Sequence, residues 1–257
     1  MRGKLIVFEG GEGSGKTTQI KRLYGWLSEN KALQADNQIA GIKFTREPGG
    51  TELGRQIRQM LLNERFSVAQ ALDQTLDQAL DQALDQAPAT EPATPLPQQI
   101  PIASKTELLL YAADRAQHVQ ETLLPWLEAG YWVLCDRYTD STVAYQGYGR
   151  QLDLNLIEQL NQIATGGLKS DLTLWLKVPP LVGLARMHQR GQADRIEQAG
   201  EAFHRRVGEG FAALAAKNAH TEAVDGDRPE AEVAAEVQQI IQQRLAQWYP
   251  HLSLNPL

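Results

Sequence analysis

Residues 10–17 read Gly10-Gly-Glu-Gly-Ser-Gly-Lys-Thr17. The stretch matches the pattern G-x-x-x-x-G-K-[ST], in which glycines let backbone N–H groups turn inward around phosphate oxygens. Lys16 is expected to reach the terminal phosphates, and the Thr17 hydroxyl to face a Mg²⁺ ion. An apolar run precedes the motif and an amphipathic run follows it, as a strand–loop–helix unit requires. The stretch therefore predicts a nucleotide phosphate site.

Outside this motif, short apolar runs alternate with amphipathic stretches. We expect strands over 5–9, 39–44, 132–136, 172–178 and 223–224, and helices from about residue 15, over 51–62, over 107–127 and around 233–245. Such alternation is typical of a mostly parallel sheet with helices on both faces. The predicted fold is a P-loop NTPase-like α/β fold, with three α/β/α layers around a mostly parallel five-stranded sheet.

One segment, 66–104, interrupts this alternation. Its 39 residues contain no Lys, Arg or His but five acids, and its first half repeats Ala-Leu-Asp-Gln in nearly identical copies. Its second half contains five prolines, which exclude a helix there. The repeat could be a helix that docks on a partner, but near-identical copies favour a low-complexity insertion in a surface loop. We expect one P-loop domain over 1–257 that carries this insertion.

Charge and composition limit the possible partners and the compartment. The chain has 257 residues and a formal net charge of −6, so it has no overall positive field to attract nucleic acid or a membrane. A single cysteine, Cys135, suits a reducing compartment. The apolar run at the N-terminus is too short for a signal peptide or a membrane span. We expect a cytoplasmic protein with no nucleic acid or membrane partner.

Arginines recur in short polar clusters, at 45–51, 114–115, 136–138 and 186–197. Several of these clusters follow predicted strands, and α/β sheets bind their ligands at that edge. Arginine binds phosphate oxygens in pairs through its planar fork, so the clusters suggest a second anion site that faces the P-loop. A phosphate acceptor there would indicate a kinase. The alternative from another class is a nucleotide-dependent switch or a regulatory ATPase, which needs no acceptor.

Five motifs in order resemble the thymidylate kinase family. They are Phe8-Glu-Gly-Gly-Glu-Gly-Ser-Gly-Lys-Thr-Thr18, Thr45-Arg-Glu-Pro-Gly-Gly-Thr51, Asp136-Arg-Tyr138, Ala144-Tyr-Gln-Gly147 and Arg190-Gly-x-x-Asp-Arg-Ile-Glu197. The resemblance covers nearly the whole chain except the insertion. It implies ATP-dependent phosphorylation of dTMP to dTDP, for dTTP synthesis, with Mg²⁺ as cofactor. A P-loop kinase for another nucleoside monophosphate is the nearest alternative.

The resemblance also implies roles on the ATP side. Lys16 and the loop amides would hold the ATP phosphates, and the nucleotide site comprises Gly10, Gly11, Glu12, Gly13, Ser14, Gly15, Lys16, Thr17 and Thr18. Thr17 would bind Mg²⁺, and Asp136 would support the metal through water or steady Arg137. A mobile lid over 186–197 would supply charge through Arg190 and Arg195, because Gly13 stands where some relatives carry an arginine.

On the dTMP side, the resemblance places Glu12 near the deoxyribose 3′-hydroxyl and makes Arg46 and Arg137 a clamp on the acceptor phosphate. Tyr111 would stack on thymine and Arg115 would donate to the base. Thr142 would lie under the base, and Tyr145 would fill the space beside C2′. Pro48 and Gln146, which belong to the matching motifs, complete the substrate-binding set. Family members are commonly homodimers, and we expect the same here.

Overall fold

The computed structural model describes residues 1–62, 102–189 and 194–252, so most of the insertion and part of the expected lid lie outside the described residues. Five strands form one sheet in the order β2-β3-β1-β4-β5, and every neighbouring pair is parallel. The strands are β1 (Leu5–Glu9), β2 (Gly41–Arg46), β3 (Tyr131–Asp136), β4 (Leu172–Lys177) and β5 (Thr221–Asp225). The predicted α/β fold is confirmed.

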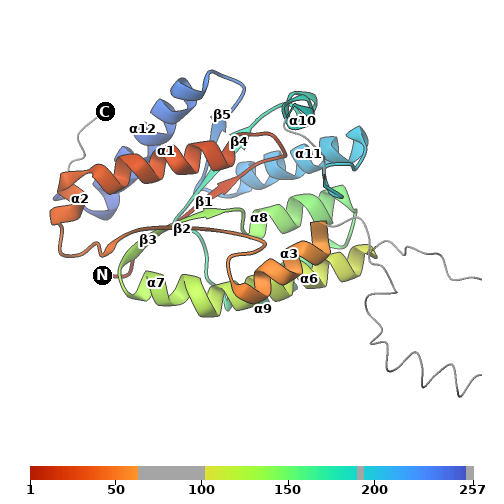
Figure 1. Ribbon diagram of the computed structural model, residues 1–257, viewed down its shortest axis with the longest axis horizontal. Helices are drawn as coiled ribbons and strands as arrows, with labels where there is room; N and C mark the ends of the chain where they lie inside the picture. The colour runs from red at the N-terminus through yellow and green to blue at the C-terminus, as the bar shows by residue number, and fades with distance from the viewer. Residues whose placement is uncertain (63–101, 190–193, 253–257) are drawn as a thin grey trace, which may run out of the picture.

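Helices cover both faces of this sheet (Figure 1). One face packs against α1 (Lys16–Glu29), α2 (Lys31–Ala35) and α12 (Glu230–Trp248). The other face packs against the run formed by α6 (Ser104–His118), η1 (Val119–Leu123) and α7 (Leu124–Glu128). Strand β1 shows why two faces are needed, because Ile6 and Phe8 enter the first core and Leu5 and Val7 enter the second.

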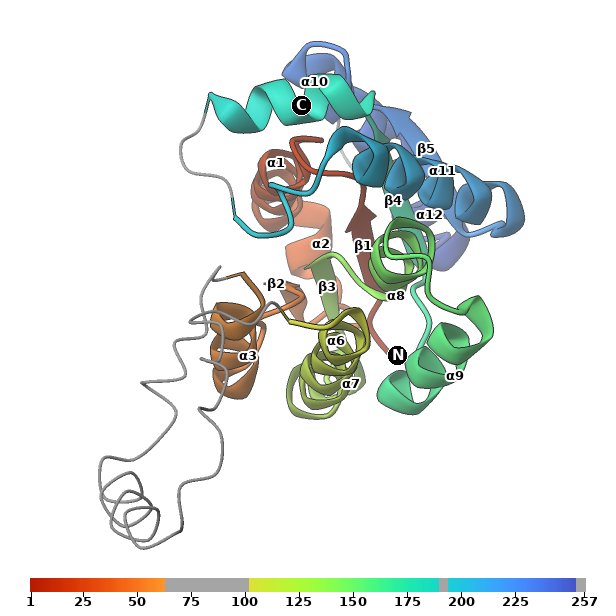
Figure 2. The ribbon, with the colours of Figure 1, turned by 90° about the vertical axis from the view of Figure 1, so that its right-hand side faces the viewer.

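The remaining helices gather beside the carboxyl ends of the strands and next to α6. Helix α3 (Glu52–Leu62) and α9 (Leu154–Thr165) flank α6, whereas α10 (Pro180–His188) and α11 (Glu201–Lys217) follow β4. Helix α8 (Thr139–Thr142) continues into η2 (Val143–Gly149), a π-helical segment. Figure 2 shows α10 and α11 above the strands and α3, α6 and α9 below them. No helix of the described part of the chain is long and apolar enough to cross a membrane.

The boundaries of several expected elements differ from the structure, and the last strand runs over Thr221–Asp225 rather than 223–224. The second strand runs over Gly41–Arg46 rather than 39–44, because its pairing with β3 continues to Arg46 opposite Asp136. The helix expected over 107–127 extends from Ser104 to Glu128 and contains the wider η1 turn. Helices α8, α9, α10 and α11 were not expected as elements. The single-domain organisation stays a prediction, because the insertion is outside the described residues.

Candidate active site

The phosphate loop lies between the end of β1 and the start of α1, as its sequence predicts. Its turns require positive φ angles at Gly10, Gly13 and Gly15, of 145°, 67° and 87°. These are values that side chains with a Cβ rarely adopt. The loop and its flanks line a cavity of about 240 Å³ together with Asp136, Glu197 and three arginines. This cavity is the candidate site for phosphate groups.

Lys16 lies folded against its own loop. Its ammonium group donates to the carbonyl oxygens of Gly10 and Gly11, both at 2.9 Å, and to the hydroxyl of Ser14 at 3.2 Å. Burial, with help from the nearby Arg137, lowers the pKa of Lys16 to about 8. An anionic phosphate would offset both effects, so the loop holds a cation that phosphate oxygens would stabilise.

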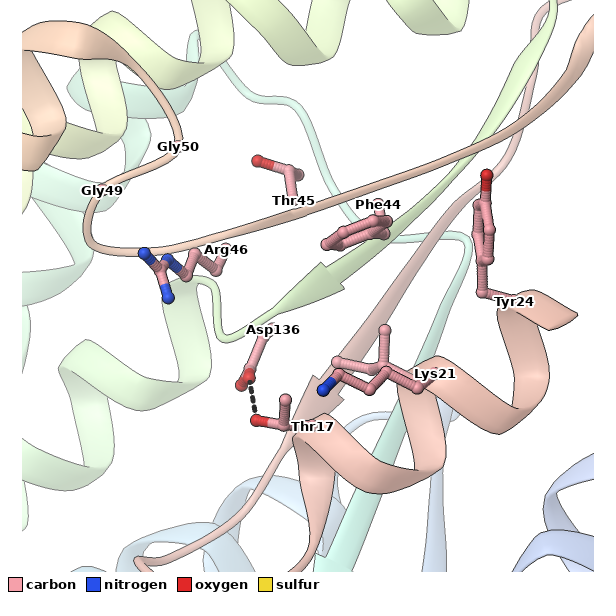
Figure 3. Close-up of a pocket in the computed structure, with 10 residues that line it drawn as sticks. Thr17, Lys21, Tyr24, Phe44, Thr45, Arg46, Gly49, Gly50 and Asp136 are labelled. Carbon is pink, nitrogen blue, oxygen red and sulfur yellow. Dashed lines mark hydrogen bonds between the residues drawn. The ribbon is translucent and has the colours of Figure 1, made fainter.

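Thr17 and Asp136 form the candidate metal site. The Thr17 hydroxyl donates to Asp136 Oδ2 at 3.1 Å (Figure 3). Asp136 Oδ1 is buried and has no hydrogen-bond partner among the described residues. Among the residues that the structure describes, no three or more His, Cys, Asp or Glu side chains are grouped so that they could hold a metal. One carboxylate and one hydroxyl fit Mg²⁺, which keeps several waters and takes the rest of its oxygens from phosphate groups.

Hydrogen bonds join Glu12, at the phosphate cavity, to Arg137 and Tyr145. Arg137 Nη2 and the Tyr145 hydroxyl both donate to Glu12 Oε1, each at 2.6 Å. Burial alone would raise the pKa of Glu12, but the positive charges of Arg137 and Lys16 outweigh it and lower the pKa to about 2. Glu12 is therefore a fixed carboxylate at neutral pH.

Arg137 is held in an unusual conformation. Its φ of 72° is one of two positive values at non-glycine residues in the described chain. Its backbone N–H donates to the Phe8 carbonyl at 2.9 Å, and its Nη1 donates to the Gly10 carbonyl and to Ser141 Oγ. Strain of this kind persists only where surrounding contacts enforce it, and it is common at functional sites. Here it turns a cation toward the phosphate loop.

Three arginines from different elements line the phosphate cavity, which supports the expected second anion site. Arg46 is exposed at the end of β2, Arg137 follows β3, and Arg58 comes from α3. Arg58 was not among the residues predicted from the sequence, and its Nη1 donates to the Pro48 carbonyl at 3.0 Å. A signal was present, because Arg58 is four residues after Gly54 and three before Leu61, on the buried side of its helix.

A second, narrower pocket opens beside this cavity. Its lining includes eight of the nine residues predicted to bind substrate, namely Glu12, Pro48, Tyr111, Arg115, Arg137, Thr142, Tyr145 and Gln146. The ninth, Arg46, lies at the neighbouring phosphate cavity. Burial raises the pKa of the Tyr111 phenol, so this ring stays neutral. The pocket thus combines an aromatic ring and polar side chains with Arg58, Arg115 and Arg137.

Arg115 makes more hydrogen bonds within the protein than its expected contact with the base implies. Its guanidinium donates to Glu47, Thr142, Asn161 and the Tyr138 carbonyl at 2.7–2.8 Å. An arginine has five N–H hydrogens, so only one, on Nη2, is left without a partner among the described residues. Arg115 therefore acts first as a buried brace under the pocket. Its expected contact with the base stays a prediction that rests on that one hydrogen.

A buried network also lies under the turn after β2. Glu47 accepts from Arg115 and is 2.8 Å from His118 Nδ1, and His118 Nε2 is 2.7 Å from the Thr45 hydroxyl. Burial would raise the pKa of Glu47, but the positive charge of Arg115 lowers it. The Glu47–Pro48 peptide bond is cis. No role for His118 was expected, because its contacts join residues more than seventy positions apart.

Glu9 is a second buried acid that the sequence analysis left without a role. It is completely buried at the end of β1. Its carboxylate accepts from the backbone N–H groups of Tyr138 and Ser141, at 2.8 and 3.1 Å, and from the Ser141 hydroxyl at 2.6 Å. Burial and the neighbouring Asp140 raise its pKa to about 7. Glu9 holds the chain turn that carries Arg137.

Of the two arginines expected in the lid, Arg195 is among the described residues and Arg190 is not. Arg195 is not in the phosphate cavity, because its side chain donates to the Leu61 carbonyl at 2.9 Å and pairs with the buried Glu107. Its expected catalytic role is therefore not supported by its position here. Glu107 also accepts from Gln146 at 2.9 Å and pairs with Arg150.

Comparisons with known proteins point to one family. The family model described as Thymidylate kinase matches residues 8–80 and 94–237. The chain is 49% identical over 265 residues to the thymidylate kinase of Cyanothece sp., covering 99% of this chain and all of that one. It is 45% identical to the thymidylate kinase of Acaryochloris marina, covering 97% of this chain and all of the relative.

A solved structure gives the same answer. The crystal structure of thymidylate kinase from Ehrlichia chaffeensis superimposes with a TM-score of 0.63 at 30% identity, covering 94% of this chain and 100% of that one. Family model, relatives and structure therefore agree over nearly the full length, with the phosphate loop and its facing arginines inside the matched part. The chain belongs to the thymidylate kinase family, whose reaction is the ATP-dependent phosphorylation of dTMP to dTDP.

Proposed function

We propose that this thymidylate kinase uses the two adjoining pockets as donor and acceptor sites. The phosphate cavity would hold the ATP phosphates through Lys16 and the amides of the loop over 10–18. The narrower pocket would hold dTMP, with the base between Tyr111 and Thr142. The observation that carries this proposal is that Arg46, Arg58 and Arg137 line the cavity between the loop and that pocket.

The arginines would supply most of the catalytic effect. Phosphoryl transfer passes through a loose transition state, so positioning and positive charge contribute more than proton transfer. The acceptor oxygen of dTMP is already ionised at neutral pH, and no general base is required. Arg137 would bridge donor and acceptor, because it contacts the loop through Gly10 and Glu12 and lines both pockets. Arg46 and Arg58 would bind the dTMP phosphate.

Glu12 and Tyr145 would shape the sugar end of the pocket. The carboxylate of Glu12 is held by Arg137 and Tyr145, and it is ionised, so it can accept from the deoxyribose 3′-hydroxyl. The Tyr145 ring packs edge-on against Phe203 and Phe211. Because these two rings hold the Tyr145 ring in place, it would exclude a ribose 2′-hydroxyl by steric contact.

Mg²⁺ is proposed as the cofactor, held by Thr17 and by Asp136, whose Oδ1 is available. When bound, it would neutralise charge on the ATP phosphates. The residues themselves hold the site in place, because Asp136 ends β3 between β1 and β2. Lid charge from Arg190 remains part of the proposal, whereas Arg195 would have to leave Glu107 to contribute.

We further propose a homodimer in the cytoplasm, with no nucleic acid partner. Large apolar side chains are exposed on α3, α6 and α9, and α6 contacts both of the other two helices. They are Leu53, Met60, Leu109, Leu154, Leu156 and Ile163. Exposed apolar patches of this kind mark contact surfaces between proteins. The acidic net charge of −6 argues against binding to nucleic acid. Sedimentation of the full chain, with Ile163→Asp as the disrupting variant, tests the dimer.

The assignment of the acceptor is tested by measuring ATP-dependent ADP release with dTMP, dUMP, UMP, CMP, AMP and GMP in turn. We expect dTMP to be preferred. A preference for another monophosphate would contradict the base pocket, and ADP release that no acceptor stimulates would contradict the second anion site.

A further inference from the structure

Helix α10 touches the phosphate loop through two glycines. A methyl group built at Gly13 would lie 2.2 Å from the carbonyl oxygen of Gly183, and one built at Gly183 would lie 2.3 Å from the carbonyl oxygen of Glu12. Both distances are far inside van der Waals contact, and both opposing atoms belong to the backbone. The peptide between Glu12 and Gly13 therefore lies directly against Gly183, the fourth residue of α10, with no room for a side chain between them.

The helix cannot easily move away from this contact. Its start is set by β4, which pairs with β1, the strand that precedes the loop. Nearer its other end, Arg186 donates to the Gly226 carbonyl at 3.0 Å and pairs with Asp227 at 2.9 Å. Gly226 follows β5. With both sides of the contact anchored to the sheet, an added atom between them must displace the loop or the helix.

The loop at this point carries two parts of the proposed site. Gly13 lines the phosphate cavity. The side chain of Glu12 joins Arg137 and Tyr145, which line the acceptor pocket. A shift of the Glu12 carbonyl would therefore move an amide on the donor side and a carboxylate on the acceptor side together. A misplacement of about 1 Å can lower a rate about a hundredfold.

We propose that Gly183 is a positioning residue for the transfer reaction: its missing side chain lets α10 press on the Glu12–Gly13 peptide and so fixes the loop relative to both substrates. The inference rests on the proposed roles of Glu12 and the loop. It also explains why residue 13 is glycine in this chain, because any side chain there would strike the Gly183 carbonyl. Positive charge at position 13 would require α10 to lie elsewhere.

The test compares Gly183→Ala with Gly208→Ala. Gly208, on α11, is the matched control, because a methyl group there would meet only Pro180 at an ordinary 3.7 Å. Both changes favour helix formation by up to about 1 kcal/mol. For Gly183→Ala we expect a loss of kcat/KM of about tenfold or more for both ATP and dTMP, with the melting temperature nearly unchanged. Gly208→Ala should keep the kinetic constants of the wild type.

Kinetic constants of Gly183→Ala within twofold of the wild type would overturn the inference. A lower melting temperature would overturn it too, if the kinetic constants measured below that temperature equalled those of the wild type. Should Gly183→Ala fail to fold, Gly13→Ala probes the same contact from the loop, and unchanged kcat/KM there would overturn the inference equally. Glu12→Ala distinguishes a failure of the proposed role of Glu12 from a failure of the Gly183 contact. If Glu12→Ala retains full activity, the proposed role of Glu12 fails, whereas the response to Gly183→Ala still tests the contact.

Discussion

Replacing Glu9 with Gln should change how stability depends on pH. Glu9 is completely buried, and its pKa is raised from an ordinary value of 4.5 to about 7 by burial and by Asp140. Between these two values the folded state binds more protons than the unfolded state. The free energy of unfolding therefore falls as pH rises through this window. A glutamine has no charge at any pH, so Glu9→Gln removes this part of the pH dependence.

The size of the effect follows from the same two pKa values. A difference of one unit corresponds to about 1.4 kcal/mol, and most of the interval between 4.5 and 7 lies between pH 5 and pH 8. Relative to the wild type, Glu9→Gln should therefore gain about 2 kcal/mol of stability between pH 5 and pH 8. Its absolute stability at pH 5 should be lower, because the amide nitrogen cannot accept the hydroxyl hydrogen of Ser141.

Urea unfolding at pH 5 and pH 8, at constant ionic strength and without metal, measures this difference. Glu158→Gln is the control, because Glu158 is exposed on α9. Its difference from the wild type should be the same at both pH values. If the difference between Glu9→Gln and the wild type were also independent of pH, Glu9 would ionise normally, and the account of its burial and its pairing with Asp140 would be refuted.

Three further changes test the site and the insertion. Lys16→Ala should abolish ADP release while circular dichroism and the melting temperature stay near those of the wild type; retained turnover would contradict the phosphate loop assignment. Arg46→Ala should raise the KM for dTMP more than the KM for ATP, because Arg46 is proposed to bind the acceptor phosphate; the opposite order would place Arg46 on the donor side. Deleting 66–104 and joining the ends with a short Gly/Ser linker should leave kcat/KM within about threefold of the full chain, since loop length has a small effect on folding free energy. A severe loss in this last assay would show that the insertion contributes to catalysis or assembly.

The parts of the site that the sequence predicted are those carried by local patterns. The phosphate loop is one continuous stretch, and Arg46, Asp136 and Arg137 directly follow or end apolar strands, so their common edge of the sheet could be expected. Glu9 and Gly183 were missed because their roles depend on partners far along the chain, namely Ser141 and Glu12. Arg58 was missed although its spacing from Gly54 and Leu61 was a usable signal.

Two expected roles stay predictions for the same reason. Arg115 and Arg195 are cations in matching motifs, but their positions depend on polar partners elsewhere in the chain. The four acceptors Glu47, Thr142, Asn161 and the Tyr138 carbonyl take four of the five N–H hydrogens of Arg115. The buried Glu107 accepts from Arg195 outside the phosphate cavity. A cation in a sequence motif binds the strongest acceptor near it in the fold. Where that acceptor belongs to another element, the motif alone does not predict the pairing.

The pairing register of the sheet also fixes a length. Phe8 on β1 and Arg46 on β2 both pair with Asp136 on β3, so these three neighbouring strands end within one residue of the same level. Adjacent strands are spaced by about 4.8 Å, so the ends of β1 and β2 lie about 10 Å apart, on either side of Asp136. The phosphate loop follows β1 and the turn over 47–51 follows β2, so backbone hydrogen bonds between the strands set the distance between the proposed donor and acceptor sites. Substitutions on the loops can change substrate choice, whereas this distance depends on the main chain and stays the same.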